Sequence, residues 1–277
     1  MNGLSLCTGY GGFELGLGAV FCGLRTVGYV EREARAAATI VARMADEGLD
    51  KAPVWDDVAT FDGRPWRGSV DIIAAGIPCQ PWSSAGKRRG SADKRWLWPH
   101  VLRIATECRP ALVAIENVPG LDVGGVRGSL REAGYESEAG LLSAGQVGAP
   151  MGRPNVITSG RDRVWVLAYA RRDGRQILRQ ALDDDGGNAS GQFADRCAEG
   201  VVRGEHRWPP RPRDVEGWRR WLIEGHPEPG FCREADGPTD GMDLSRADRI
   251  ALLGGGVVPL QAAVAMRTLA HRILADG

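Results

Sequence analysis

The chain has 277 residues, of which 43% are hydrophobic, and its 35 basic side chains balance its 35 acidic ones. This size predicts one large domain, or one domain with a small insert, and the zero net charge argues against a surface that is basic throughout. The sequence shows no apolar run of membrane-spanning length, no signal-peptide pattern and no C-x-x-C pair among its six cysteines, so we expect a cytoplasmic protein with reduced thiols, no disulfide framework and no metal.

Short apolar runs alternate with helical patterns along the first half of the chain. The runs at 4–6, 26–30, 71–75 and 111–115 predict β-strands, and the patterns at 34–46 and 98–108 predict helices. This alternation is typical of a parallel sheet covered by helices on both faces. A further strand is expected at 163–170, and a helix at 258–275.

The composition changes after residue 170. Residues 171–244 are rich in Gly, Arg, Asp and Pro and contain few apolar runs, which is compatible with a disordered linker or a small irregular domain. Trp208, Trp218 and Trp221 favour the small domain, because disordered segments are poor in aromatic residues. We therefore expect a domain at 1–170, an inserted domain at 171–244, and a segment at 245–277 that returns to the first domain.

Glycines follow the first predicted strand at Gly9, Gly11 and Gly12. Glycine lets a backbone turn sharply and approach a ligand at a helix amino terminus, although a plain strand-to-helix turn fits the same residues. Glu31 ends the second strand, where nucleotide-binding folds place a ribose-binding acid, and Asp57 holds a comparable position after a third strand. Together these residues predict a cofactor that contains adenosine.

Cys79 follows the apolar run at 71–75 and precedes a basic cluster formed by Lys87, Arg88 and Arg89. Most isolated cysteines are small core side chains, and a basic cluster is usually a solvated surface. A second basic stretch with tryptophans, at 203–221, makes a polyanionic partner plausible. Glu116 ends the apolar run at 111–115, and alone it would be an ordinary acid at a strand end.

Seven motifs occur in a fixed order along the chain, and the set resembles the DNA cytosine-5 methyltransferase family. They are TGYGG at 8–12, Glu31, WDDV at 55–58, GIPCQPWSSAG at 76–86, AIENVPG at 114–120, GRDRVWVLA at 160–168 and GGGVVPLQ at 254–261. The resemblance implies an α/β fold with a Rossmann-like, doubly wound methyltransferase sheet and a small inserted target-recognition domain. It also implies S-adenosyl-L-methionine as cofactor and double-stranded DNA as partner, and we expect a monomer.

The resemblance assigns Cys79 as the nucleophile. Cytosine carbon 5 is too electron-poor to attack a methyl donor, and a thiolate that adds to carbon 6 makes carbon 5 nucleophilic. By the same resemblance Glu116 contacts the target base, while Arg161 and Arg163 position the flipped nucleotide, with a structural salt bridge as their alternative role. The remaining implied residues are Gly9, Gly11, Gly12, Phe13, Glu31, Asp57 and Leu97 for the cofactor, and Pro78, Gln80, Ser83 and Asn117 for the substrate. Phe13 fits a core position equally well.

Two features depart from the family pattern. Extra residues, roughly 152–159, precede Arg161, and Gly255 stands where the family typically has asparagine. They leave two alternatives open, a weak or silent DNA-binding relative and an RNA-directed cytosine methyltransferase. The sequence does not indicate the DNA target or a partner nuclease.

Overall fold

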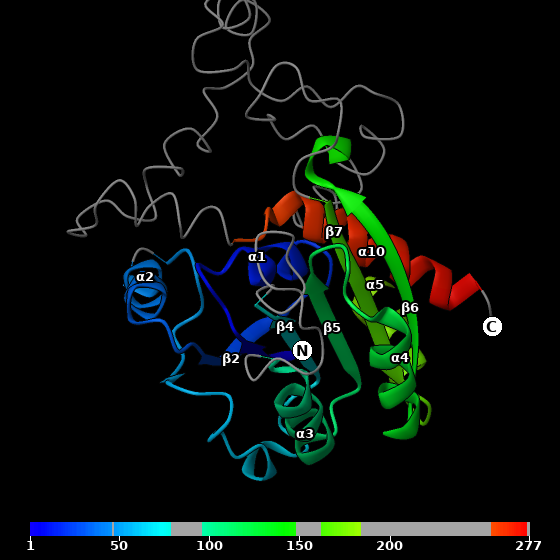
Figure 1. The fold of residues 1–277 in the computed structure, drawn as a ribbon, viewed down its shortest axis with the longest axis horizontal. Coiled ribbons are helices and arrows are strands. Elements are labelled where there is room, and N and C mark those ends of the chain that lie inside the picture. Colours follow the sequence, from blue (N-terminus) through cyan, green and yellow to red (C-terminus); the bar gives the residue numbers. More distant parts are fainter. Residues whose placement is uncertain (46, 79–95, 148–161, 184–255, 276–277) are drawn as a thin grey trace, which may run out of the picture.

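The computed structural model describes residues 1–45, 47–78, 96–147, 162–183 and 256–275, and Figure 1 shows how they are arranged. The described strands form one seven-stranded sheet in the order β3-β2-β1-β4-β5-β7-β6. The strands are β1 (Asn2–Leu6), β2 (Arg25–Val30), β3 (Val54–Trp55), β4 (Ile72–Gly76), β5 (Leu112–Asn117), β6 (Tyr135–Ser143) and β7 (Asp162–Ala170). The helices are α1 (Gly12–Gly18), α2 (Ala34–Ala45), α3 (Trp98–Cys108), α4 (Val123–Glu132), α5 (Gly174–Asp183) and α10 (Pro259–Ala275), with short 3-10 helices η1 (Arg64–Trp66) and η3 (Ala144–Val147).

The sheet is mixed, and the parallel pairing expected for the strands of the first half is confirmed for β1, β2, β4 and β5. Strands β1 to β5 pair in parallel, whereas β7 pairs antiparallel with both β5 and β6. Strand β6 was missed in the sequence because it lies at the edge of the sheet and its first half is mostly polar, as in Tyr135-Glu136-Ser137-Glu138. Without a long apolar run, such a strand gives only a weak local signal.

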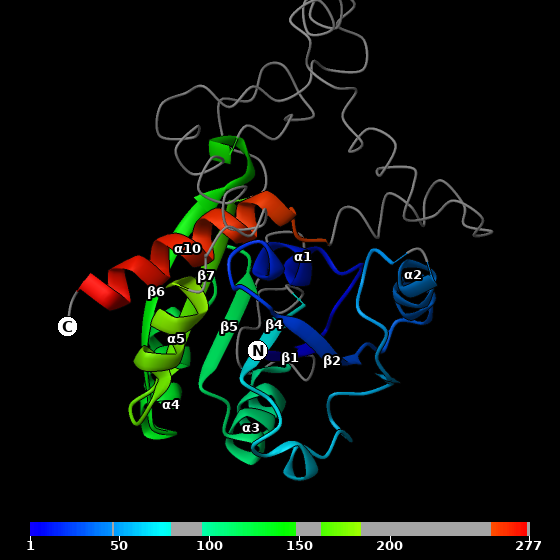
Figure 2. The same cartoon turned by 180° about the vertical axis from the view of Figure 1, so that it is seen from behind.

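Helices cover both faces of the sheet, as a doubly wound α/β fold requires (Figures 1 and 2). Alternate residues of the central strands point to opposite faces. In β4, Ile73 and Ala75 join the core cluster that contains α3 and α4, and Ile72 and Ala74 join the cluster that contains α1, α5 and α10. The predicted fold class is therefore confirmed for the part of the chain that the structure describes.

The carboxyl-terminal helix α10 packs against α1 from the start of the chain, as the sequence led us to expect. Helix α5 was not expected, because it falls within the segment assigned to the inserted domain. Its residues Leu178 and Ala181 lie in the same core cluster as Met266 and Ile273 of α10. The domain division remains a prediction, and this packing favours a boundary after Asp183.

The helix predicted at 98–108 matches α3, and the helix predicted at 34–46 matches α2 up to the last described residue, Ala45. Helix α4 was missed because its three glycines, Gly124, Gly125 and Gly128, lower its intrinsic helix propensity. Its amino terminus is capped by Asp122, whose carboxylate accepts a hydrogen bond of 2.9 Å from Gly125 N. Within the described ranges, none of the helices combines the length and the hydropathy needed to cross a bilayer.

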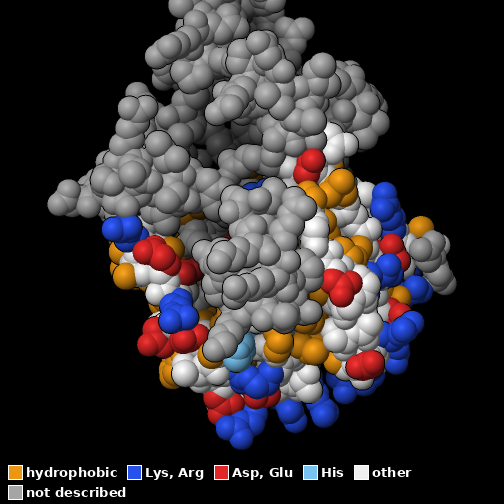
Figure 3. Space-filling model, in the orientation of Figure 1, with side chains coloured by type: hydrophobic (Ala, Val, Ile, Leu, Met, Phe, Trp, Pro, Cys, Tyr) orange, Lys and Arg blue, Asp and Glu red, His pale blue; other side chains and the backbone are white. Residues whose placement is uncertain are grey.

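Basic and acidic side chains both line the lower and right-hand margin of the described surface in Figure 3. Exposed ion pairs contribute to this mixture elsewhere on the described chain, for example Arg64 with Asp62 at 2.8 Å and Arg171 with Glu136 at 2.8 Å. The two basic segments predicted to contact a polyanion, 87–95 and 203–221, lie outside the described residues.

Candidate active site

The glycine loop joins β1 to α1 at the carboxyl edge of the sheet. Gly9 and Gly11 have φ values of 61° and 88°, a region in which side chains are strained. A side chain on Gly12 would come within 2.1 Å of Val257 O, and the Tyr10 hydroxyl donates a hydrogen bond to the same carbonyl. The segment before α10 therefore packs directly on this loop, and only glycine fits at residue 12.

Glu31 lies directly beneath the glycine loop, at the end of β2. Its Oε2 accepts a hydrogen bond of 2.8 Å from Gly9 N, and its Oε1 accepts one of 2.8 Å from Glu33 N. Burial raises the pKa of this carboxyl above its usual value, although these backbone hydrogen bonds act in the opposite direction. The structure thus brings together two of the elements that the sequence predicted for a cofactor site.

Asp57 lies at the next strand end along the edge. Its Oδ1 accepts a hydrogen bond of 2.8 Å from Ala59 N, and its Oδ2 lies 3.9 Å from Arg32 Nε. The side chain remains 30% exposed, so it can still reach a ligand. Glu31 and Asp57 belong to neighbouring strand ends, because Glu31 N donates to Trp55 O at 2.9 Å.

Cys7 is a residue of this edge that the sequence did not single out. It has a φ of 56°, which is unusual for a residue with a side chain. Its pKa is raised to about 12, first by burial and then by the negative charges of Glu31 and Asp57. Its position directly after β1 and before Thr8-Gly9 is the sequence feature that places it at this edge. The prediction of reduced, scattered thiols gave it no such place.

Glu116 and Arg163 form a buried ion pair where β5 and β7 lie side by side. Arg163 Nε lies 2.6 Å from Glu116 Oε1, and the two side chains are 12% and 8% exposed. Arg163 Nη1 also donates to Asp162 O at 3.0 Å. The antiparallel pairing of β7 with β5 places the start of one strand beside the end of the other, and this register brings the two predicted residues together.

The chain that leads toward Cys79 leaves β4 beside Glu116. Gly76 is the register partner of Glu116, and Ile77 N donates to Glu116 O at 3.3 Å. A side chain at Gly76 would lie 3.2 Å from Cys7 O and 3.9 Å from Glu116 Oε2, so glycine keeps open the space between the glycine loop and the acid. Pro78, two residues further on, is exposed at the limit of the described segment.

Asn117 follows Glu116 and is 1% exposed. Its Oδ1 accepts a hydrogen bond of 2.8 Å from Val118 N, so the side chain orders the turn after β5. Its Nδ2 is buried and has no hydrogen-bond partner among the described residues. This amide is therefore a donor held at the same strand end as the ion pair.

Two of the expected cofactor residues lie in the core. Phe13 is 2% exposed, and its ring packs edge-on against Trp165 with centroids 5.6 Å apart. This contact favours the core position that the sequence left open for Phe13. Leu97 directly precedes α3 and packs, partly buried, on the core cluster that contains Val58.

Four predicted site residues lie outside the described residues. They are Cys79, Gln80, Ser83 and Arg161. Both departures from the family pattern, the extra residues at roughly 152–159 and Gly255, also lie outside the described residues. Their effect on activity therefore remains a prediction. Within the described ranges, no three His, Cys, Asp or Glu side chains are grouped so that they could hold a metal ion.

Comparison with known families agrees with this geometry. The family model for the C-5 cytosine-specific DNA methylase matches residues 1–168, which include the glycine loop, Glu31, Asp57 and the Glu116–Arg163 pair. The chain belongs to the C-5 cytosine-specific DNA methylase family. Six of the seven motifs recognised in the sequence lie within this match, and GGGVVPLQ at 254–261 lies outside it.

Similar methylases include two type II methyltransferases. M.NgoMIV of Neisseria gonorrhoeae is 34% identical over 161 residues, which cover 56% of this chain and 49% of that protein. M.NaeI of Lentzea aerocolonigenes is 30% identical over 161 residues, which cover 56% of this chain and 38% of that protein. The match thus spans half or less of these relatives.

Two solved structures share this fold. The Dnmt2 methyltransferase of S. pombe superposes with a TM-score of 0.58, covers 99% of both chains and shares 15% sequence identity. The DNMT2 of Spodoptera frugiperda gives a TM-score of 0.55 at 15% identity. At this identity the likeness concerns the fold alone.

Proposed function

We propose that this chain is a DNA (cytosine-5) methyltransferase that transfers a methyl group from S-adenosylmethionine to a cytosine in a defined site of double-stranded DNA. The observation that carries the proposal is the buried Glu116–Arg163 pair beside the strand that leads to Cys79. Two acids at the neighbouring strand ends and the glycine-rich loop lie at the same edge. Family membership supports the reaction, and the arrangement of these groups supports the mechanism below.

The residues of the glycine loop suit S-adenosylmethionine. Nothing in the described chain lies within 4 Å of a side chain placed on Gly9, so a ligand can approach the backbone there, and carboxylates at Glu31 and Asp57 are acceptors for ribose hydroxyls and for an adenine amino group. When bound, this cofactor supplies an electrophilic methyl group. Glu31 is the ribose-binding residue in this proposal, and Asp57 binds at the adenine end.

Cys79 is the proposed nucleophile on the target base. Its thiolate sulfur forms a bond to carbon 6 of cytosine, and the electron pair moves to carbon 5, which then takes the methyl group. Loss of the carbon 5 proton and cleavage of the bond between sulfur and carbon 6 return the thiolate and release methylated cytosine. The base must leave the duplex for this reaction, because its ring is otherwise stacked and paired.

Glu116 is proposed to hydrogen-bond ring nitrogen 3 and the exocyclic amine of the cytosine. When it is protonated, a carboxyl held at that position donates to nitrogen 3 and stabilises the negative charge that develops on the ring as the thiolate adds. Arg163, 2.6 Å from Oε1 and almost fully buried, holds this carboxyl in one orientation. The buried Nδ2 of Asn117 is a further donor beside it, in line with the substrate role proposed for Asn117.

Bisulfite sequencing of DNA from cells that express the protein tests this function and identifies the target site. Purified protein should also form a covalent complex with DNA that contains 5-fluorocytosine, because fluorine at carbon 5 blocks release. Cys79→Ala should lose both the methylation and the complex, and Cys22→Ala is the matched control that should keep both. Methylation by Cys79→Ala would refute the assignment.

Two further measurements, of DNA binding and of transfer RNA methylation, separate the two alternative functions. A protein that binds DNA without methylating it would be the silent relative. Methylation of transfer RNA without methylation of DNA would identify an RNA-directed enzyme instead.

A further inference from the structure

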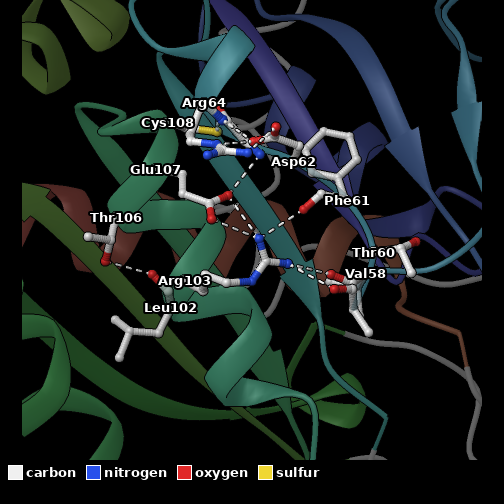
Figure 4. A network of polar contacts seen from close by, with 12 residues as sticks. Val58, Thr60, Phe61, Asp62, Arg64, Leu102, Arg103, Thr106, Glu107 and Cys108 are labelled. Atoms are coloured by element: carbon white, nitrogen blue, oxygen red, sulfur yellow. Dashed lines mark hydrogen bonds and ion pairs between the residues drawn. The ribbon is translucent and has the colours of Figure 1, made fainter.

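Arg103 of α3 binds the backbone of a segment far from it in the sequence (Figure 4). Its Nη1 donates to Phe61 O at 2.9 Å, and its Nη2 donates to Val58 O at 3.0 Å and to Ala59 O at 3.3 Å. The side chain is 35% exposed, so most of the guanidinium is withdrawn from water. One side chain thus serves three carbonyls of a single turn.

Glu107, one helical turn after Arg103, fixes the guanidinium. Arg103 Nη1 lies 2.9 Å from both carboxylate oxygens of Glu107, and Glu107 Oε2 also accepts a hydrogen bond of 2.8 Å from Gly63 N. Cys108 Sγ donates to Gly63 O at 3.3 Å. Segment 58–63 is therefore attached to α3 at both of its ends.

The same segment determines where Asp57 lies. Asp57 O accepts hydrogen bonds from Thr60 N at 3.2 Å and from Phe61 N at 3.1 Å, and Asp57 Oδ1 accepts from Ala59 N at 2.8 Å. The amides of this turn face Asp57, and its carbonyls face Arg103. A displacement of the carbonyl side consequently moves the amides that orient the Asp57 carboxylate.

We propose that Arg103 is a positioning residue for Asp57, and that it sets the preference of the site for an adenine base over bases without a 6-amino group. This inference rests on the proposed function, in which Asp57 binds the adenine end of the cofactor. The planar guanidinium carries five donors in a fixed fork, which suits several carbonyls at once, whereas an ammonium group acts as a point charge.

Removal of Arg103 should leave α3 in place, because Val101, Ile104 and Cys108 on the same helix are fully buried. The three carbonyls then lose their shared donor, and the turn that carries Asp57 is released from the helix. We expect selectivity to fall while general affinity for the cofactor is retained. A merely structural role would weaken binding of every adenosine-like ligand by the same factor.

Calorimetry with two ligands distinguishes these outcomes. S-adenosylhomocysteine presents a 6-amino donor to Asp57, and S-inosylhomocysteine presents a 6-oxo acceptor that the carboxylate cannot bind. One hydrogen bond to a charged group corresponds to a preference of about tenfold or more for the adenosyl ligand in the wild type. Asp57→Ala should remove this preference, and Arg103→Ala should reduce it to about twofold.

Arg64→Ala is the matched control. Arg64 lies just after the same turn, and its guanidinium donates to the exposed carboxylate of Asp62 at 2.9 and 2.8 Å, away from the carbonyls that Arg103 binds. It should keep the full preference. In a double-mutant cycle, Arg103→Ala should have no further effect on the preference when Asp57 is already Ala.

Each outcome decides between the assignments. If Arg103→Ala fails to fold by thermal melting, Arg103→Lys and Glu107→Gln replace it, and both should lose part of the preference. A folded Arg103 variant with the full preference overturns the role of Arg103 alone, as does an undiminished effect of Arg103→Ala in the Asp57→Ala background. A wild type that binds neither ligand overturns the proposed cofactor, and the role of Arg103 with it.

Discussion

At the scale of single residues, Glu14 places a carboxyl group inside the core beneath the glycine loop. It is 8% exposed, and its Oε1 accepts a hydrogen bond of 2.6 Å from Ser5 Oγ, while its Oε2 is buried and has no hydrogen-bond partner in the described part of the chain. Burial raises its pKa from 4.5 to about 7. Because the folded pKa exceeds the unfolded one, the fold binds the proton more tightly and loses stability as the pH rises from 4.5 through about 7.

Replacement of the Glu14 carboxyl tests whether stability falls as the pH rises. With about 1.4 kcal/mol for each pKa unit, ionisation of Glu14 should cost the wild type about 3 kcal/mol between pH 4.5 and pH 8, and Glu14→Gln should not show this loss. Urea unfolding at several pH values measures the free energy of unfolding of both proteins. The exposed Glu132→Gln is the control and should follow the wild-type profile. Parallel profiles for Glu14→Gln and the wild type would contradict the assignment.

At the scale of elements, the contact between α1 and α10 depends on a helical glycine. A side chain on Gly16 would lie 2.5 Å from Ala262 Cβ and 2.6 Å from Pro259 O, whereas nothing lies within 4 Å of a side chain on Gly18. Gly16→Ala should therefore lower the free energy of unfolding by about 1–3 kcal/mol, because the helices must separate. Gly18→Ala should leave it unchanged or raise it by up to about 1 kcal/mol.

Urea unfolding of the two variants checks this pair of substitutions. Both add one methyl group to the same helix, so a difference between them reports the packing against α10 and not helix propensity. Equal changes in the two variants would show that α10 adjusts freely to α1.

At the scale of the whole molecule, α5 and α10 flank the segment 184–255 in the sequence. Both helices contribute residues to one core cluster. Replacement of this segment by a flexible linker of about 20 residues should leave both helices anchored, because loop closure costs little more for longer linkers. We expect cofactor binding to persist, since the glycine loop, Glu31 and Asp57 lie outside the segment. Preference for one DNA sequence should disappear, because phosphate contacts carry no sequence information.

Binding of the linker variant to duplexes with and without the target site tests whether segment 184–255 supplies the sequence preference. Retained site preference would mean that residues elsewhere read the bases. In the full chain, Ala substitution of Arg211 and Arg213 should weaken binding to all sequences equally and flatten its salt dependence if both contact phosphates. A loss at one base position would instead indicate direct readout by one of them.

The sequence by itself determined the central strands, α3 and the order of the family motifs. These features are local, because an apolar run such as 111–115 or the periodicity of 98–108 is complete within a few residues. The same local character explains why β6 and α4 were not predicted. Strand β6 acquires its identity from pairing with β7, and the glycine-rich α4 is stabilised by packing of Val126 and Leu130 in the core.

Only the tertiary structure decided which side chains meet. Glu116 and Arg163 were both predicted site residues, but their ion pair depends on the antiparallel register of β5 and β7. Arg103 gave no sequence signal, because its partners Phe61 and Val58 lie 42 and 45 residues away along the chain. Contacts of this kind form when the sheet brings distant segments to one edge, and no pattern within either segment encodes the distance between them.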